Sequence, residues 1–182
     1  MIAFPTALAD VLLVEPRVIE DERGWFMETW HAERFAAAGI DVHFVQDNHS
    51  CSRRGVVRGM HYQVRRAQGK LVRVVAGEVY DVAVDLRRSS ATFGRSVELV
   101  LSAASRKMLW IPPGFAHGFL ALSERAELAY KCTDFYDPAS ERTLLWNDPQ
   151  LAIRWPIPEG TVVITSAKDR AGAPLAEAET YP

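Results

Sequence analysis

The sequence has little cysteine, no long apolar run and almost no net charge, and each absence excludes a class of protein. Two cysteines, Cys51 and Cys132, are too few for a disulfide framework or a structural zinc site. No uninterrupted apolar stretch is long enough to span a bilayer. The first ten residues lack the basic and apolar regions of a signal peptide. We therefore expect a cytoplasmic protein with reduced thiols and no membrane partner.

The charge balance excludes proteins that bind nucleic acid or anionic membranes through a generally basic surface. A formal net charge of −2 gives no basic surface for nucleic acid or anionic lipid. Hydrophobic residues make up 48% and charged residues 24% of the chain, the usual globular balance, which excludes disorder over most of the length. With 182 residues, the chain is expected to form one domain over residues 1–182.

Most of the chain has the pattern of short strands separated by turn residues. The Ala-rich segment His31–Gly39, with its Gly stop, predicts a helix. The predicted strands are Val11–Pro16, Phe44–Ser50, Lys70–Ala76, Glu78–Leu86, Ser96–Ser102, Lys107–Ile111, Gly118–Ala121 and Glu127–Asp134. Strands spaced in this way, with few helices, predict an all-β sandwich or barrel. The tail over 166–182 is expected to be irregular.

The predicted strand Glu78–Leu86 has two different faces. Because side chains alternate along a strand, the apolar residues at even positions share one face, which belongs in a core. The other face carries Asp81 and Asp85 among small residues. That face suits either a solvent-facing strand or the polar interior of a barrel, and the sequence leaves both open.

The segment Ile111-Pro112-Pro113-Gly114-Phe115-Ala116-His117 has the form of the second cupin motif. A Pro–Gly turn leads into a strand there, and the histidine projects into the barrel mouth. A metal site would also need two histidines spaced two apart and a carboxylate. His61 is followed two positions on by Gln63, so no metal is predicted. His117 alone fits a hydrogen-bonded core histidine equally well.

His61 lies between Arg58 and Lys70 in the sequence. A neutral imidazole suits a general base. Two nearby cations favour the neutral form and attract an anionic substrate, and Lys70 could stabilise an enolate oxygen. The same cluster could be a salt-bridged surface. Tyr130 could likewise be a core tyrosine or a proton donor that faces His61 across a pocket.

Taken together, these stretches resemble the dTDP-4-dehydrorhamnose 3,5-epimerase family over nearly the whole chain. The motifs that carry the resemblance are Asp21–Glu28, Gln46–Ser50, Arg58–Gln63, Gln68–Arg73, Asp81–Arg87, Ile111–Phe119, Tyr130-Lys131, Trp146–Pro149 and Ser166–Asp169. The resemblance implies an all-β, cupin-type jelly roll with a few short helices. It also implies a homodimer that exchanges N-terminal strands and uses neither metal nor organic cofactor.

The resemblance further implies a reaction and its catalytic residues. The family inverts C3 and C5 of dTDP-4-dehydro-6-deoxy-D-glucose, a dTDP-linked 4-keto-6-deoxyhexose, to give dTDP-4-dehydro-L-rhamnose. By resemblance, His61 is the base, Asp169 its partner and Tyr130 the acid on the opposite face. Lys70 and His117 would lie near the developing negative charge. Both carbons are α to the C4 ketone, so an enolate makes their protons acidic.

Other matching positions are expected to bind the nucleotide sugar. They are Arg23, Glu28, Gln46, Asn48, Arg58, His117, Tyr136, Glu141 and Lys168. Arg23 and Arg58 would hold the diphosphate, because planar guanidinium groups suit phosphate oxygens, and Tyr136 would stack on the nucleobase. Arg23 and Glu28 are expected to reach the partner subunit's site. Asp81 is hypothesised to orient Lys70.

One departure from the family bears on the substrate. The loop Val64–Ala67 is one residue shorter than the family form and lacks its usual proline. The sequence therefore leaves two alternatives open. One is an epimerase acting at C3 only or C5 only on a related nucleotide-linked 4-ketosugar. The other is a cupin that binds a nucleotide sugar without catalysis.

Overall fold

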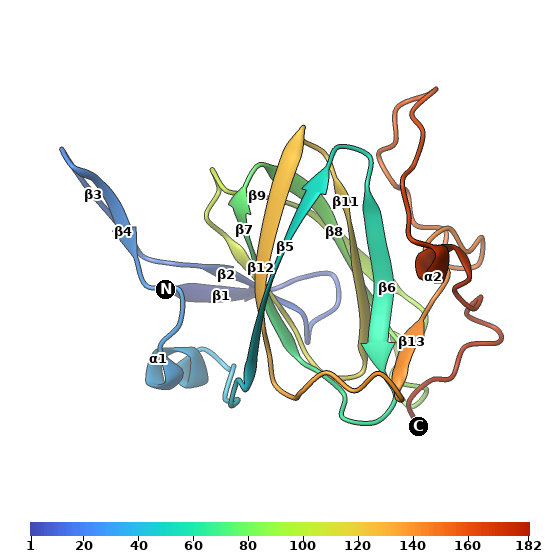
Figure 1. Ribbon diagram of the computed structural model, residues 1–182. Coiled ribbons are helices and arrows are strands. Elements are labelled where there is room, and N and C mark those ends of the chain that lie inside the picture. Colours follow the sequence, from blue (N-terminus) through green and yellow to red (C-terminus); the bar gives the residue numbers. More distant parts are fainter.

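Two antiparallel β-sheets packed face to face form the body of the molecule (Figure 1). The computed structural model describes residues 1–182. The first sheet, in spatial order, contains β1 (Ile2–Pro5), β2 (Leu12–Glu15), β10 (Met108–Ile111), β7 (Lys70–Ala76), β12 (Arg125–Cys132) and β5 (Gln46–Arg53). The second contains β13 (Glu141–Thr143), β6 (Val57–Gln63), β11 (Phe115–Ala121), β8 (Glu78–Asp85) and β9 (Ser96–Ser102). The predicted β-sandwich is confirmed.

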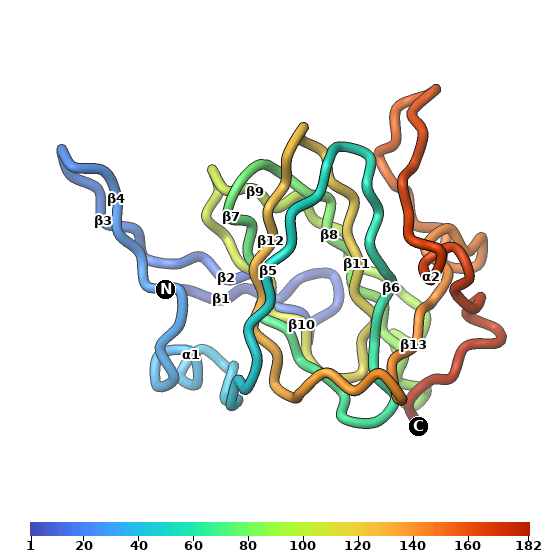
Figure 2. The backbone as a smooth tube through the Cα atoms, viewed as in Figure 1, coloured from blue at the N-terminus to red at the C-terminus, as the bar shows by residue number.

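Three smaller elements lie outside the sandwich. The hairpin of β3 (Val18–Asp21) and β4 (Gly24–Met27) projects away from the body (Figure 2). Helix α1 (Ala32–Ala37) confirms the helix expected over 31–39, and it buries Phe35 against the outer face of the first sheet. Helix α2 (Ala167–Arg170) is a single turn near the C-terminus. No helix of the chain has the length and apolar character needed to cross a membrane.

The main core fills the space between the sheets. Its members include Val72 and Leu128 from the first sheet, and Val79 and Phe119 from the second. Burial of these side chains removes apolar surface from water, the dominant favourable term in folding. Each of β7 and β8 contains three valines, in agreement with the strand preference of β-branched side chains.

Both faces of β8 are buried, which settles the alternatives left open by its sequence. The even positions, such as Val82 and Val84, pack with Leu144 and Leu175 of the C-terminal segment. The odd positions face the interior of the sandwich, and Asp81 is fully buried there. The barrel-interior interpretation is therefore correct, and the solvent-facing one is wrong.

The C-terminal segment, residues 144–182, is mostly irregular, as expected for its tail over 166–182, and it forms an outer layer over the second sheet (Figures 1 and 2). Its attachment includes the backbone bridges Leu144–Ala173 and Arg87–Tyr181. The sequence patterns did not predict α2 within this layer. Because α2 contacts β6, the layer brings a segment remote in sequence beside the centre of the sandwich.

Strand β6 was also missed by the strand prediction, and it is the strand that carries His61. Arg58 and Gly59 interrupt its apolar pattern. The glycine is needed because β6 and β11 approach closely. A Cβ at Gly59 would lie 2.5 Å from Cα of Gly118, so a side chain has no room there. The pairing sets His61 directly opposite His117.

Strands β1, β3, β4 and β13 were likewise missed, and β11 begins three residues before its predicted start. These missed strands have three or four residues each, too short to show a clear alternation of apolar and polar side chains.

Candidate active site

A cavity of about 310 Å³ lies between the two sheets and gathers most of the expected site residues. Those that line it are Gln46, Asn48, Arg58, His61, Lys70, His117, Tyr130, Tyr136 and Glu141. They come from strands of both sheets, except Tyr136, which lies in the loop between β12 and β13. The sandwich therefore provides a polar pocket with walls of different chemistry.

His61 forms a short hydrogen bond with Asp169, in which His61 Nε2 lies 2.6 Å from Asp169 Oδ1. The Oγ of Ser166 accepts a hydrogen bond from the Asp169 backbone N–H at 3.0 Å and caps the turn of α2. Burial alone would raise the pKa of Asp169, but the hydrogen bonds and charge of His61 bring that pKa below its usual value. Since an ionised carboxylate only accepts, Nε2 of His61 donates and the other ring nitrogen can take a proton.

A second imidazole–carboxylate pair lies deeper in the same sheet. Nε2 of His117 is 3.0 Å from each carboxylate oxygen of Asp81. Both side chains are buried. The hypothesis that Asp81 orients Lys70 stays a prediction: the Asp81 carboxylate bonds to His117, while its charge acts to raise the pKa of Lys70 against the larger effect of burial. The ammonium of Lys70 instead donates to the backbone carbonyl of His61 at 3.2 Å.

The first sheet supplies Lys70 from β7 and Tyr130 from β12. Burial lowers the pKa of Lys70 below its usual value. Burial also raises the pKa of Tyr130 to about 12, so its hydroxyl stays protonated at neutral pH. His61 and His117 belong to the opposite sheet. A base on one wall and a protonated acid on the other can act on opposite faces of one carbon, with Lys70 available to an oxyanion.

Ion pairs and hydrogen bonds connect the mouth of the cavity to α2. Lys168 Nζ lies 2.7 Å from Glu141 Oε1, and the Tyr136 hydroxyl donates to Glu141 Oε2 at 3.0 Å. Arg58 donates to Ser52 Oγ at 3.0 Å and keeps its guanidinium beside the cavity. This edge therefore offers cationic and aromatic groups together.

Arg23 and Glu28 are not brought to the cavity of their own chain. Arg23 lies in the β3–β4 turn, where it pairs with Asp21, and Glu28 pairs with Arg34 at 3.0 Å. Within one chain these two predicted binding residues do not join the site.

Sequence reasoning missed three polar residues of the cavity, Ser50, Gln63 and Gln68. The buried Oγ of Ser50 has no hydrogen-bond partner, so it is available to a ligand. The sequence did hold a signal for Ser50. Gln46, Asn48 and Ser50 lie at every second position of β5, so their side chains share one face of the strand. For Gln63, the sequence indicated only that this position lacks the second histidine of a metal site.

A β-sandwich with an imidazole–carboxylate pair opposite a partly buried tyrosine has the architecture of a cupin-type isomerase. The chain belongs to the dTDP-4-dehydrorhamnose 3,5-epimerase family, whose model matches residues 5–177. The chain is therefore an isomerase of the epimerase class.

Relatives and solved structures give the same family. A dTDP-4-dehydrorhamnose 3,5-epimerase from Pseudomonas aeruginosa is 55% identical over 177 residues, which cover 97% of each chain. The structure of a 3,5-epimerase from Legionella pneumophila in complex with dTDP-4-keto-L-rhamnose is 49% identical, has a TM-score of 0.93, and covers 97% of this chain and 94% of that one. A 3'-monoepimerase from Streptomyces bikiniensis in complex with dTDP-quinovose is more distant, at 33% identity, a TM-score of 0.87 and coverage of 94% and 87%.

Proposed function

We propose that the enzyme inverts both C3 and C5 of dTDP-4-dehydro-6-deoxy-D-glucose and forms dTDP-4-dehydro-L-rhamnose. The observation that carries the proposal is the placement of the His61–Asp169 pair and Tyr130 on opposite walls of one cavity. The 55% identity to a 3,5-epimerase, against 33% to a monoepimerase, supports double inversion over inversion at one carbon.

In each inversion, His61 removes the proton from the carbon α to the C4 ketone. The C–H bonding electrons form the new C–C double bond, and the carbonyl electrons move to the C4 oxygen as an enolate. The carboxylate of Asp169, 2.6 Å away, stabilises the imidazolium that results. Positioned acid–base groups of this kind typically contribute ~10²–10⁴-fold.

Tyr130 completes the inversion by donating its phenolic proton to the same carbon from the other face. The enolate then collapses to the ketone. Exchange with solvent restores the proton of Tyr130 and removes the one held by His61. A pKa of about 12 keeps Tyr130 protonated before each donation. Protonation from the wall opposite the base is what changes the configuration.

Lys70 and His117 are the groups we assign to the enolate oxygen. Both line the cavity and both are buried. Away from water, a fixed donor aimed at a developing oxyanion is worth more than in solution, and loss of one such donor typically costs ~10²–10³-fold in kcat. Because Nε2 of His117 is engaged by the Asp81 carboxylate, the ring would donate to the enolate oxygen through Nδ1–H as an imidazolium, whose charge Asp81 would balance.

Lys70→Met is expected to separate activity from stability. Turnover should fall by about 10²–10³-fold because the enolate loses a charged donor. The melting temperature should rise, because methionine fills similar space without the cost of a buried ammonium. Steady-state kinetics and calorimetric melting measure the two effects. Unchanged turnover would remove Lys70 from the mechanism.

The nucleotide half of the substrate is proposed to bind at the mouth. Arg58 would contact the diphosphate, with Lys168 and Glu141 beside it, and Tyr136 would stack on the base. Gln46 and Asn48 lie side by side on β5, in the wall formed by the first sheet, and Gln46 Nε2 donates to Asn48 Oδ1 at 3.1 Å. The substrate test compares turnover of the dTDP-linked 4-ketosugar with its GDP- and CDP-linked counterparts, coupled to an NADPH-dependent reductase. Preference for another nucleotide would contradict the assignment.

We further propose a homodimer in which the β3–β4 hairpin reaches the partner's cavity. The hairpin projects from the body (Figure 1). It exposes Ile19, Trp25 and Phe26, the last at 68%. Apolar side chains gathered on so thin a projection suit burial against another surface. This arrangement would bring Arg23 and Glu28 to the partner's nucleotide.

Mixed dimers test this exchange. Arg23→Ala should weaken substrate binding by roughly tenfold through loss of a charge-assisted contact. A dimer of one His61→Asn chain and one Arg23→Ala chain then holds one intact site, with His61 and Arg23 from different chains. Co-expression with two tags should therefore recover activity at low substrate concentration. Mixed dimers no more active than either parent, or a monomer by sedimentation, would contradict the exchange.

Residues 1–182 are proposed to act as one domain, because the tail supplies Asp169 to the sandwich and covers its second sheet. A cytoplasmic location suits the two cysteines, which are free thiols. The proposed chemistry needs no cofactor, since a ketone-activated proton, a base and an acid suffice. Stoichiometric, tightly bound metal in the purified protein would contradict this mechanism.

A further inference from the structure

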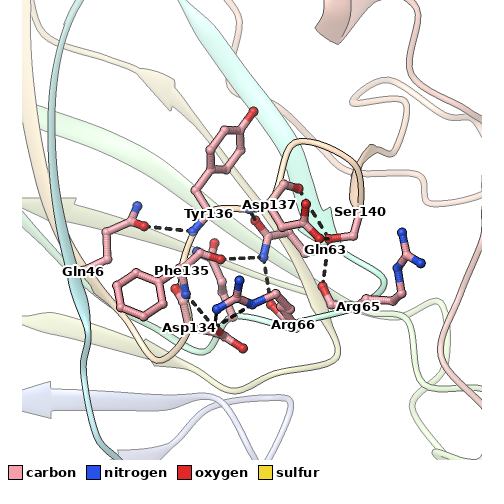
Figure 3. Close-up of polar contacts among 10 residues, drawn as sticks. Gln46, Gln63, Arg65, Arg66, Asp134, Phe135, Tyr136, Asp137 and Ser140 are labelled. Atoms are coloured by element: carbon pink, nitrogen blue, oxygen red, sulfur yellow. Dashed lines mark hydrogen bonds and ion pairs between the residues drawn. The ribbon is translucent and has the colours of Figure 1, made fainter.

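The loop over 134–140, which carries Tyr136, is held between the two sheets by a pair of glutamines (Figure 3). Gln46 Oε1, from β5, accepts a hydrogen bond from the Tyr136 backbone N–H at 2.9 Å. Gln63 Oε1, from β6, accepts one from the next backbone N–H, that of Asp137, at 2.8 Å. Two successive amides are thus fixed by opposite walls of the cavity.

The other half of the Gln63 carboxamide is also occupied. Its Nε2 donates to the carbonyl of Arg66 at 2.8 Å and to that of Phe135 at 3.2 Å. Gln63 is only 3% exposed, so water does not compete strongly for these bonds. One buried side chain therefore joins the loop over 64–67 to the loop over 134–140.

Further contacts strengthen the same junction. Ser140 Oγ donates to the Arg65 carbonyl at 3.0 Å, and Arg66 Nη2 lies 2.8 Å from Asp134 Oδ1. The Arg66 guanidinium also stacks over the Phe135 ring, 5.5 Å from its centroid. The loop over 64–67 is thus part of the support of Tyr136.

The structure also explains the residue type at position 63. A neutral histidine, which a metal-binding cupin would carry at this spacing from His61, offers one N–H and one lone pair. The site uses two N–H groups and one acceptor. A glutamine meets that requirement and a histidine does not.

We propose that Gln63 is a positioning residue that sets the place of Tyr136 and, through it, the affinity for the nucleotide. The inference rests on the proposed function, in which Tyr136 contacts the nucleobase. The Tyr136 side chain is 51% exposed, and its one hydrogen bond goes to Glu141. Its location is therefore set mainly by the backbone that Gln63 and Gln46 hold. Gln63 acts through Tyr136 and not on the reacting carbons.

Gln63→Leu tests the proposal with dTDP as the probe. The Kd for dTDP, by titration calorimetry, and the KM of the nucleotide sugar should each rise about tenfold, as for loss of anchoring hydrogen bonds. The kcat should stay within about twofold of wild type. The matched control is Gln150→Leu, at an exposed position in the outer layer, which should bind dTDP as the wild type does. If Gln63→Leu does not fold, Gln63→Glu keeps an acceptor for Asp137, loses both N–H donors and sets a carboxylate oxygen against the carbonyls of Arg66 and Phe135, so the same rise in Kd is expected.

A double-variant cycle separates positioning from general loosening. In a Tyr136→Ala background, Gln63→Leu should weaken dTDP binding by less than about twofold, because the residue it positions is gone. A full tenfold effect in that background would overturn the proposal, as would a wild-type Kd in Gln63→Leu alone. Failure of the wild-type enzyme to bind dTDP would instead overturn the proposed nucleotide site.

Discussion

His61→Asn is expected to abolish turnover and also the exchange of C3 and C5 protons with solvent. Asparagine can accept a hydrogen bond but cannot take a proton near neutral pH, so neither enolate forms. The loss should be at least ~10²–10⁴-fold, the usual contribution of a positioned base. The measurement is deuterium uptake from D2O by mass spectrometry, together with coupled turnover.

The matched control for His61→Asn is His43→Asn. His43 is exposed in the segment before β5 and lies outside the cavity lining, so this variant should retain wild-type activity. Exchange at the wild-type rate in His61→Asn would refute the assignment of the base. Loss of activity in the control would indicate that the substitution damages the protein generally.

Tyr130→Phe is expected to reduce inversion far more than proton removal. The variant keeps the ring but loses the hydroxyl, so His61 still forms the enolate, exchanges the proton it has taken for a deuteron from D2O, and returns that deuteron to the original face. Solvent exchange at C3 should therefore persist while net epimerisation falls by about 10²–10⁴-fold. Exchange and product formation can be measured in one D2O incubation.

Tyr80→Phe is the control for this variant. The hydroxyl of Tyr80 donates to Glu98 on the outside of β8 and has no part in the cavity. Burial likewise raises its pKa to about 12, so the control matches Tyr130 in acidity and differs in place. Equal loss of exchange and inversion in Tyr130→Phe would contradict the acid role.

The sandwich itself could be predicted from local pattern, because long strands such as β8 and β12 show clear apolar runs bounded by turns. The strand β6, which bears the proposed base His61, could not be predicted in this way. In β6 the close approach of Gly59 to Gly118 depends on a neighbour 59 positions away in the chain. Residues 57–63 form a strand because of tertiary packing, which cannot be predicted from a local sequence pattern.

The residues of the site likewise divide into those that a local pattern predicts and those that only the three-dimensional structure or the family resemblance brings together. Alternation along β5 puts Gln46 and Asn48 on one face, so part of the nucleotide wall could be found from spacing. The pairing of His61 with Asp169 spans 108 positions and was available only through the family resemblance. The hydrogen bond between Asp81 and His117 could not be predicted, because strand faces do not show which nearby side chain a buried carboxylate contacts.

The most direct test of double inversion is a count of deuterons. The wild-type enzyme is incubated in D2O with dTDP-4-dehydro-6-deoxy-D-glucose, and the product is reduced by an NADPH-dependent reductase before mass spectrometry. Two deuterons in a reducible product, one at C3 and one at C5, are predicted. One deuteron at a single carbon would contradict double inversion and indicate a single-site epimerase. No deuterium would contradict the reaction on this substrate.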